Sequence, residues 1–304
     1  MLSSRGTFPF SFKQNKMKKT LAVLILLTAC LGLEAQIWME QPQRQDSLEL
    51  YFTVYGYPGG RIGRNYTFRY DLIRKTSLWV AYPLNQNLCG RSFPEAREEI
   101  WSSDTHMPES FQPSVYRDFD WRHGYTRGFL LPPDDRQTPM AYPQSFRPVN
   151  VVPLMPEFKD GILAALEKTV RYWAYKSDTL FVVSGVIPGE KTVLDNAGEK
   201  MSVPDYVYKT VLRCYTEKDE VYWDACSVLL PHRPDIPCGE YKNYIKVLRR
   251  YTISIEMLEE LTGETYFPLL ESLVGEEAYR YLKKKDPSKE DWWWKRHLFP
   301  IIIP

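Results

Sequence analysis

The chain has 304 residues, of which 44% are hydrophobic, 14% aromatic and 25% charged. A chain with so many aromatic side chains can bury a large core, so this composition excludes an intrinsically disordered protein. The length suits one large domain or two small ones. The 39 basic and 38 acidic residues give a formal net charge of +1, close to neutrality.

Residues 1–35 have the features of a secretory signal peptide region, and translation is predicted to begin at Met17. A basic start is followed by the apolar run from Leu21 to Leu27. This run is too short to span a bilayer, which needs about 20 apolar residues. Cleavage after Ala35 would release a soluble exported protein into the periplasm or the extracellular space.

A second processing route stays open in the same region. The four residues that end at Cys30 resemble a bacterial lipoprotein box, in which this cysteine would carry a lipid. Cleavage after Ala35 would remove five basic residues and one acidic residue, leaving 34 basic and 37 acidic residues. The resulting net charge of about −3 excludes a general attraction to polyphosphate, although a local basic patch is compatible with it.

Strand-like segments rich in β-branched and aromatic residues occur on both sides of a long polar region. They are Leu78–Leu84, Thr179–Val186, Val203–Leu212 and Val221–Leu230. Between the first two, the chain from Pro94 to Pro148 is rich in Pro, Asp, Arg and Ser and is expected to be mostly irregular. Long irregular segments of compact domains are often functional.

Two helices are predicted among these strands. Apolar residues recur at helical spacing over Pro156–Tyr175, which indicates an amphipathic helix packed on a core. Ser254 is a suitable N-cap for a helix through Leu261, and Gly263 would end that helix. Helices and strands in this order predict an α+β domain.

The mature chain divides into three predicted parts. A linker at 36–49 leads into a domain at 50–272, and a C-terminal helix with a Trp-rich tail occupies 273–304. Trp292–Trp294 are expected to pack against the body of the protein, with an exposed contact surface for a protein partner as the alternative. No segment after the signal region predicts a transmembrane helix.

Four cysteines remain after removal of the signal region, namely Cys89, Cys214, Cys226 and Cys238. In an exported protein an even number of cysteines indicates disulfides, so at least one bond is expected among the last three. No Cys-x-x-Cys pair or His/Cys spacing indicates a zinc site.

Residues Tyr125–Arg136 resemble the signature of the DNA/RNA non-specific endonuclease family, which runs approximately Tyr-Asp-Arg-Gly-His-Leu-Ala-Pro and ends in Asp-Arg. The resemblance covers 50–272, because other segments match the family in the same order. These are Trp79–Tyr82, Trp101–Asp104, Asn150–Pro153, Lys159–Glu167, Phe181–Gly185, Val203–Asp205, Tyr208–Lys209 and Leu258–Gly263. The resemblance implies a ββα-metal nuclease fold, with a central, mostly antiparallel sheet flanked by helices.

The resemblance also implies a mechanism. In this family a loop histidine activates water, and an asparagine on the following helix holds one hydrated Mg²⁺, which neutralises charge at the scissile phosphate. An arginine and a glutamate complete the site. Arg127, Gly128, Asn150 and Glu167 match the family pattern. Of these, Arg127, Asn150 and Glu167 are the candidate catalytic residues.

Two decisive positions depart from the family pattern. Phe129 stands at the general-base position and has no proton acceptor, and Lys159 stands at the metal-ligand position. A protonated lysine has no lone pair and repels Mg²⁺. Thr126 and Asp160 replace an aspartate and an arginine of the pattern. The sequence therefore predicts impaired nuclease chemistry, with no bound metal or cofactor.

The ammonium of Lys159 could take the place of the metal's charge. On a continuous helix Lys159 and Glu167 would share one face about 12 Å apart. Because an unpaired ammonium in a cleft is costly, Lys159 is expected to point towards Glu167, Asp160 or a backbone carbonyl.

Three functions stay open. The first is an impaired nuclease-like protein retained for binding nucleic acid, through Arg127 and Lys159, or a protein partner. The second is an active Mg²⁺-dependent endonuclease or phosphodiesterase with a relocated base at His123 or His106. Its replacement metal ligands would come from the carboxylates Asp134, Asp135 and Asp160. The third is a structural envelope subunit that uses the Trp-rich C-terminus as its contact.

Overall fold

The computed structural model describes residues 38–44, 51–56, 63–89, 99–119, 124–237 and 241–294. The predicted signal peptide region with Cys30, the alternative base His123, Cys238 and the tail after Trp294 lie outside the described residues. Among the described residues, every helix is too short or too polar to cross a membrane.

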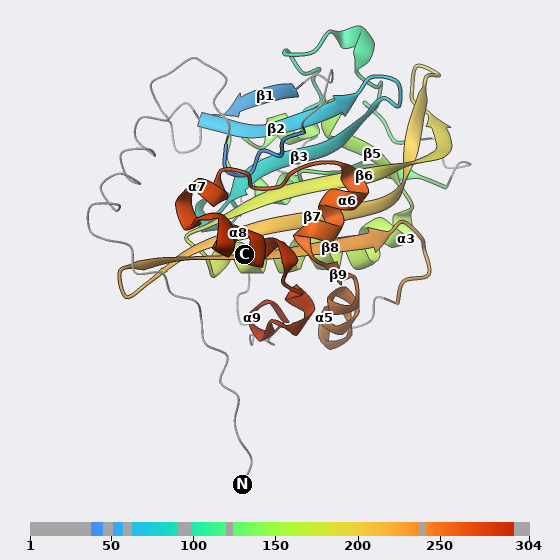
Figure 1. The fold of residues 1–304 in the computed structure, drawn as a ribbon. Coiled ribbons are helices and arrows are strands. Elements are labelled where there is room, and N and C mark those ends of the chain that lie inside the picture. The colour runs from blue at the N-terminus through green and yellow to red at the C-terminus, as the bar shows by residue number, and fades with distance from the viewer. Residues whose placement is uncertain are drawn as a thin grey trace.

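A seven-stranded antiparallel sheet forms the centre of the structure (Figure 1), in the order β1-β2-β3-β6-β7-β8-β9. Its strands are β1 (Tyr51–Gly56), β2 (Gly63–Asp71), β3 (Thr76–Leu84), β6 (Thr179–Leu194), β7 (Lys200–Glu217), β8 (Glu220–Pro231) and β9 (Thr252–Ile253). The apolar runs make β6 and β7 central, because alternate side chains are buried on opposite faces. Val182 packs in the core on one face and Val183 in the core on the other.

Helices cover both faces of the sheet. On one face α4 (Ala164–Tyr175) packs in the same core cluster as Val182. On the other face α6 (Ile255–Thr262), α7 (Leu270–Val274) and α8 (Glu276–Lys284) surround the cluster of Val183, and they lie in front of the sheet in Figure 1. The remaining helices are α2 (Gln86–Cys89), α3 (Pro156–Phe158), α5 (Tyr241–Arg250) and α9 (Asp291–Trp294). The predicted α+β fold with a central antiparallel sheet is confirmed.

A second, two-stranded sheet lies in the region between β3 and β6. Its strands β4 (Thr126–Phe129) and β5 (Val151–Leu154) pair antiparallel, so that Phe129 is opposite Val151. In the described residues from 99 to 148, the chain outside β4 consists of bends and short 3-10 turns, as its composition predicts. The family signature therefore begins on a strand whose partner strand leads directly into the predicted helix.

The helix predicted over Pro156–Tyr175 is interrupted. After α3, residues Lys159–Leu163 form a π-helical turn, and Gly161 adopts φ −94° and ψ −107°, outside the helical region. Regular helix resumes at Ala164. The expectation that Lys159 and Glu167 share one continuous helical face is therefore wrong, because a π turn rotates the two flanking segments relative to one another.

The helix predicted after Ser254 is confirmed as α6. The Ser254 side chain accepts a hydrogen bond from the Met257 backbone N–H, as an N-cap does, and Gly263 ends α6 in the left-handed conformation at φ 72°.

The predicted disulfide is wrong for Cys214 and Cys226. They lie on neighbouring strands, but Cys214 is opposite Trp223 and Cys226 is opposite Val211, so the thiols are not register partners. Both thiols are free, as is that of Cys89, among the described residues. Cys238 lies outside them.

The Trp-rich segment packs into the core, as expected. Trp293 and Trp294 are buried, and the Trp293 ring lies 4.8 Å from that of Trp173. The Trp173 indole N–H donates to the Trp293 carbonyl at 3.1 Å. On the outer side, the Arg213 guanidinium lies 3.4 Å from the ring centre of Trp292. Trp293 and Trp294 are therefore not available as a contact surface for a partner.

Candidate functional site

Asn150 connects the start of β5 to the loop that follows β4. Its side-chain N–H groups donate to the carbonyls of Leu131 and Ser145, each at 2.8 Å, and its side-chain oxygen accepts from the Leu131 N–H at 2.8 Å. The residue is fully buried. Because every polar atom of this side chain has a protein partner and the residue is fully buried, Asn150 positions the loop and is not exposed to a ligand.

Phe129, at the general-base position, belongs to an aromatic cluster with Trp101 and Phe146. Its ring stacks on Trp101 at a centroid distance of 6.0 Å and meets Phe146 edge-on at 5.6 Å. Trp101 and Phe146 are themselves 5.7 Å apart. Aromatic rings therefore occupy the position where the family pattern places a titratable nitrogen.

Arg127 extends this cluster on the same side of β4, because alternate residues of a strand share a face. Its guanidinium lies 4.5 Å from the ring centre of Trp101, pairs with Glu99 at 2.9 Å and donates to the Val115 carbonyl at 3.2 Å. This arrangement holds the guanidinium, the indole and the Phe129 ring in one stack, with Arg127 partly exposed at its outer end.

Lys159 opens the π-helical turn, and its backbone N–H donates to the Met155 carbonyl at 2.9 Å. Its ammonium makes no hydrogen bond or ion pair with any residue that the structure describes. The predicted contact with Glu167, Asp160 or a carbonyl is therefore wrong. Because Lys159 is only partly buried, water can solvate its charge.

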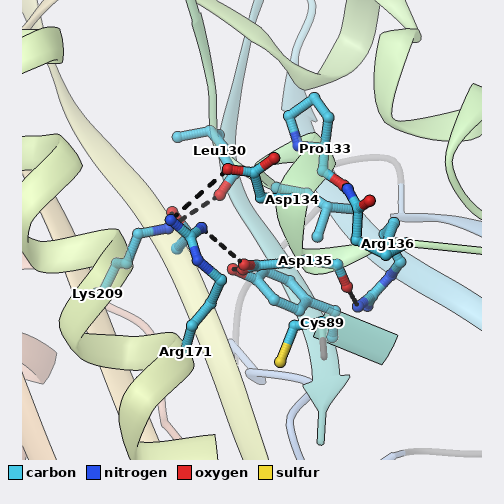
Figure 2. Close-up of polar contacts among 12 residues, drawn as sticks. Cys89, Leu130, Pro133, Asp134, Asp135, Arg136, Arg171 and Lys209 are labelled. Carbon is cyan, nitrogen blue, oxygen red and sulfur yellow. Dashed lines mark hydrogen bonds and ion pairs between the residues drawn. The ribbon is translucent and has the colours of Figure 1, made fainter. Parts of the chain in front are cut away.

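A cluster of charges lies beneath the loop that follows Phe129 (Figure 2). The buried Lys209 on β7 donates to the Leu130 carbonyl at 3.1 Å and to the Ser184 hydroxyl at 2.9 Å. From α4, Arg171 pairs with Asp135 at 3.2 Å and with Asp134 at 3.7 Å.

Asp135 joins this cluster to the central sheet. Its second carboxylate oxygen accepts from the Tyr82 hydroxyl at 2.9 Å, and the guanidinium of the following Arg136 donates to the Asp135 backbone carbonyl at 2.7 Å. Both residues are buried. The Asp-Arg pair that ends the family signature therefore holds the loop on β3.

Glu167 completes the cluster, one helical turn before Arg171. Burial raises its pKa from 4.5 to about 7, and the neighbouring cations Lys209 and Arg171 offset only part of that shift. Burial likewise lowers the pKa of Lys209, against the opposing effect of Glu167. Both groups are therefore driven towards their neutral forms, although each is next to an opposite charge.

The residues present do not fit the hydrated Mg²⁺ that the family pattern implies. Lys159 contributes a positive charge in place of an oxygen ligand, and the side-chain oxygen of Asn150 is fully buried against the Leu131 N–H. Within the described part of the chain, no group of three or more His, Cys, Asp or Glu side chains has a geometry that could hold a metal.

The structure brings together most of the candidate residues. Phe129 and Arg127 share one stack, Asn150 anchors the adjoining loop, and Glu167 neighbours the lysine that binds the Leu130 carbonyl. Lys159 shares no described side-chain contact with them.

Sequence reasoning missed two members of the charge cluster. Lys209 could have been found as the only charged residue after Asp205 in the apolar run that ends at Leu212. Arg171 could have been found from its spacing, since residues four apart lie on one helical face.

A strand pair that leads into a helix, set against a central sheet, is the arrangement of a ββα nuclease. A profile of the family described as DNA/RNA non-specific endonuclease matches residues 49–273. The chain belongs to this family.

Two curated relatives have similar sequences. The mitochondrial nuclease EXOG of Xenopus laevis is 26% identical over 248 residues, which cover 77% of this chain and 65% of that protein. A protein named nuclease from Nostoc sp. is 25% identical over 211 residues, which cover 66% of this chain and 70% of that protein. The matched part is thus about two thirds of the length of each relative.

Proposed function

We propose that this chain is an exported, nuclease-like protein that binds nucleic acid and has lost efficient hydrolysis. The observation that carries the proposal is the packing of Phe129 against Trp101 and Phe146, where the family places its general base. Export rests on the signal peptide region at 1–35, which lies outside the described residues.

The loss of hydrolysis follows from the chemistry of two side chains. Phe129 cannot accept a proton from water, and Lys159 cannot coordinate a metal while protonated. Removing a general base costs about 10²–10⁴ in rate, and a missing metal adds a further loss, because the charge on the scissile phosphate is then stabilised by cations alone.

Binding is supported by the cations that remain at the surface of the site. Arg127 lies over Trp101 with part of its side chain exposed, and the ammonium of Lys159 has no partner among the described residues. Arginine and lysine at such positions can contact phosphate oxygens, and a guanidinium on an aromatic ring also offers a stacking surface for a base.

The proposal is tested with a fluorescein-labelled oligonucleotide, the full mature chain and Mg²⁺. Fluorescence anisotropy should rise with protein concentration at low salt, and a denaturing gel should show the same oligonucleotide intact afterwards. Arg127→Ala should weaken binding. Absence of binding at low salt would contradict the binding role, and fragments that chelator suppresses would contradict the loss of hydrolysis.

An active enzyme with a relocated base is the second candidate, because His106 carries a feature of a catalytic histidine. Its Nδ1 lies 3.1 Å from the buried Asp104 carboxylate, which orients the ring and leaves the other nitrogen free to face solvent. If this candidate holds, the wild-type protein cleaves the oligonucleotide with Mg²⁺, and His106→Ala abolishes the cleavage.

A further inference from the structure

A second group of basic residues surrounds a pocket at the β9 edge of the sheet, away from Phe129. The pocket has a volume of about 740 Å³ and is bordered by α5, β9, α6, α8 and the turn before α9. Strand β8 lies between it and β7, which carries Lys209. In Figure 1 helices α5 and α9 lie beside this edge.

The lining of this basic pocket is strongly unbalanced in charge. It contains Lys246, Arg249, Arg250 and Lys284 but a single carboxylate, Asp286. That carboxylate is already engaged, since it accepts from the Ser288 N–H at 3.0 Å and pairs with Lys289 at 3.4 Å. Lys289 offsets part of its charge, and the lining as a whole keeps an excess of positive charge.

Among the residues that the structure describes, two of the four cations have partners and two do not. Arg249 donates to the Ser288 carbonyl and pairs with Asp291 at 3.7 Å, which ties α5 to the C-terminal segment. Lys284 pairs with Glu256 at 3.6 Å. Lys246 and Arg250, one turn apart on α5, are exposed and have no partner among the described residues. Folding does not explain their presence beside the pocket.

The other lining groups suit a phosphate ester. Ser254 accepts from the Met257 N–H, so its hydroxyl proton stays available for donation, and Ser288 adds another hydroxyl. Ile253 and Met257 form an apolar wall that can contact a sugar or base. The volume lies within the range of about 300–1,000 Å³ that is usual for pockets that bind small organic groups.

We propose that the basic pocket binds the phosphates of a nucleic-acid strand, as a second contact separate from the Phe129 site. The proposal rests on the proposed function for its choice of ligand. We favour a strand over an anionic membrane because the pocket is concave and offers the hydroxyls of Ser254 and Ser288 beside its cations, which suits individual phosphate groups. Lys246 and Arg250 contact the strand directly, and Arg249 and Lys284 add to the local potential.

The test uses Lys246→Glu and Arg250→Glu, separately and together, in the full mature chain. Lys218→Glu is the matched control, since Lys218 is an exposed lysine at the β7–β8 turn with the same charge change and no described partner. Thermal unfolding confirms that each variant is folded. Binding of a fluorescein-labelled single-stranded oligonucleotide is then measured by anisotropy over a series of salt concentrations.

The proposal predicts that the double variant binds at least about tenfold more weakly and that the slope of log K against log salt falls by about 1.4, since each phosphate contact on a single strand contributes roughly 0.7. The Lys218→Glu control should behave as the wild type. If the double variant binds the oligonucleotide as tightly as the wild type does, the basic pocket is not a binding site, and the proposed function is unaffected.

Two further outcomes separate the remaining explanations. If the wild type binds no oligonucleotide but binds vesicles containing anionic lipid, and Lys246→Glu abolishes this, the ligand is a membrane and the proposal is wrong. If the oligonucleotide binds through Lys246 and Arg250 but is cleaved with Mg²⁺, the proposed role of the basic pocket is supported, and the proposal that hydrolysis is lost is wrong.

Discussion

Glu167 is held next to two cations, yet burial keeps its pKa high at about 7. Because this value lies above the ordinary 4.5, the folded protein retains a proton between these pH values that the unfolded chain releases. This contribution to stability is fully present below pH 4.5 and is lost as the pH rises to about 7.

The variant Glu167→Gln isolates this effect, because glutamine resembles the protonated carboxyl group at every pH. The free energy of unfolding of the wild type, relative to that of the variant, should fall on the order of 3 kcal/mol between pH 4.5 and 7. Urea unfolding over this pH range measures the difference. A difference that does not change with pH would show that burial does not control this carboxyl group.

Asn150 provides the second prediction at the residue scale. Asn150→Ala removes three hydrogen bonds and leaves buried backbone groups of Leu131 and Ser145 unpaired. The free energy of unfolding should fall by about 3 kcal/mol or more, since each unpaired buried group costs about 1–3 kcal/mol. Asn196→Ala, at a partly exposed asparagine with weaker contacts, is the control and should cost less than about 1 kcal/mol.

At the scale of the elements, the strand predictions were correct, and the prediction of one regular helix over Pro156–Tyr175 was wrong. The apolar runs of β6, β7 and β8 identified these strands, although β7 and β8 extend beyond both predicted ends and β6 extends beyond its predicted C-terminal end. The helix prediction treated Pro156–Tyr175 as regular. The spacing of apolar residues shows which face of a helix is buried. It does not show whether one turn contains an extra residue, so the π-helical turn at Lys159–Leu163 could not be predicted from it.

Helix α9 belongs to the core through Trp293 and Trp294, so the loss of either ring should lower the free energy of unfolding. Trp293→Ala deletes a buried ring that contacts Trp173, so the free energy of unfolding should fall by about 3–5 kcal/mol. Tyr281→Ala on neighbouring α8, at a residue that is 58% exposed, should change it by less than about 0.5 kcal/mol. Equal effects of the two substitutions in urea unfolding would contradict the packing role.

On the scale of the whole molecule, the order of motifs was enough to predict the fold, because each motif marks an element of the family. Contacts between distant elements were not predictable in the same way. The free thiols of Cys214 and Cys226 depend on the register of β7 and β8, which cysteine counting ignores. The partners of Lys209 and the basic pocket depend on how segments far apart in the chain pack together.

The candidate site shows the same division. The sequence motifs alone identified Phe129 at the general-base position and Lys159 at the metal-ligand position. They also showed that neither side chain can perform the expected role. The aromatic cluster that encloses Phe129 could not, since Trp101 and Phe146 are 28 and 17 positions away in irregular segments. The aromatic packing of Phe129 thus supports the proposal that a single substitution does not restore cleavage.

The measurement that tests the central claim most directly is plasmid nicking with Mg²⁺, with and without chelator. We predict that the wild type and Phe129→His leave the plasmid intact, because a restored base still lacks a metal ligand. Phe129→His combined with Lys159→Asn should give weak nicking that chelator abolishes. Efficient nicking by the unmodified protein, abolished by chelator, would contradict the claim that its hydrolytic chemistry is lost.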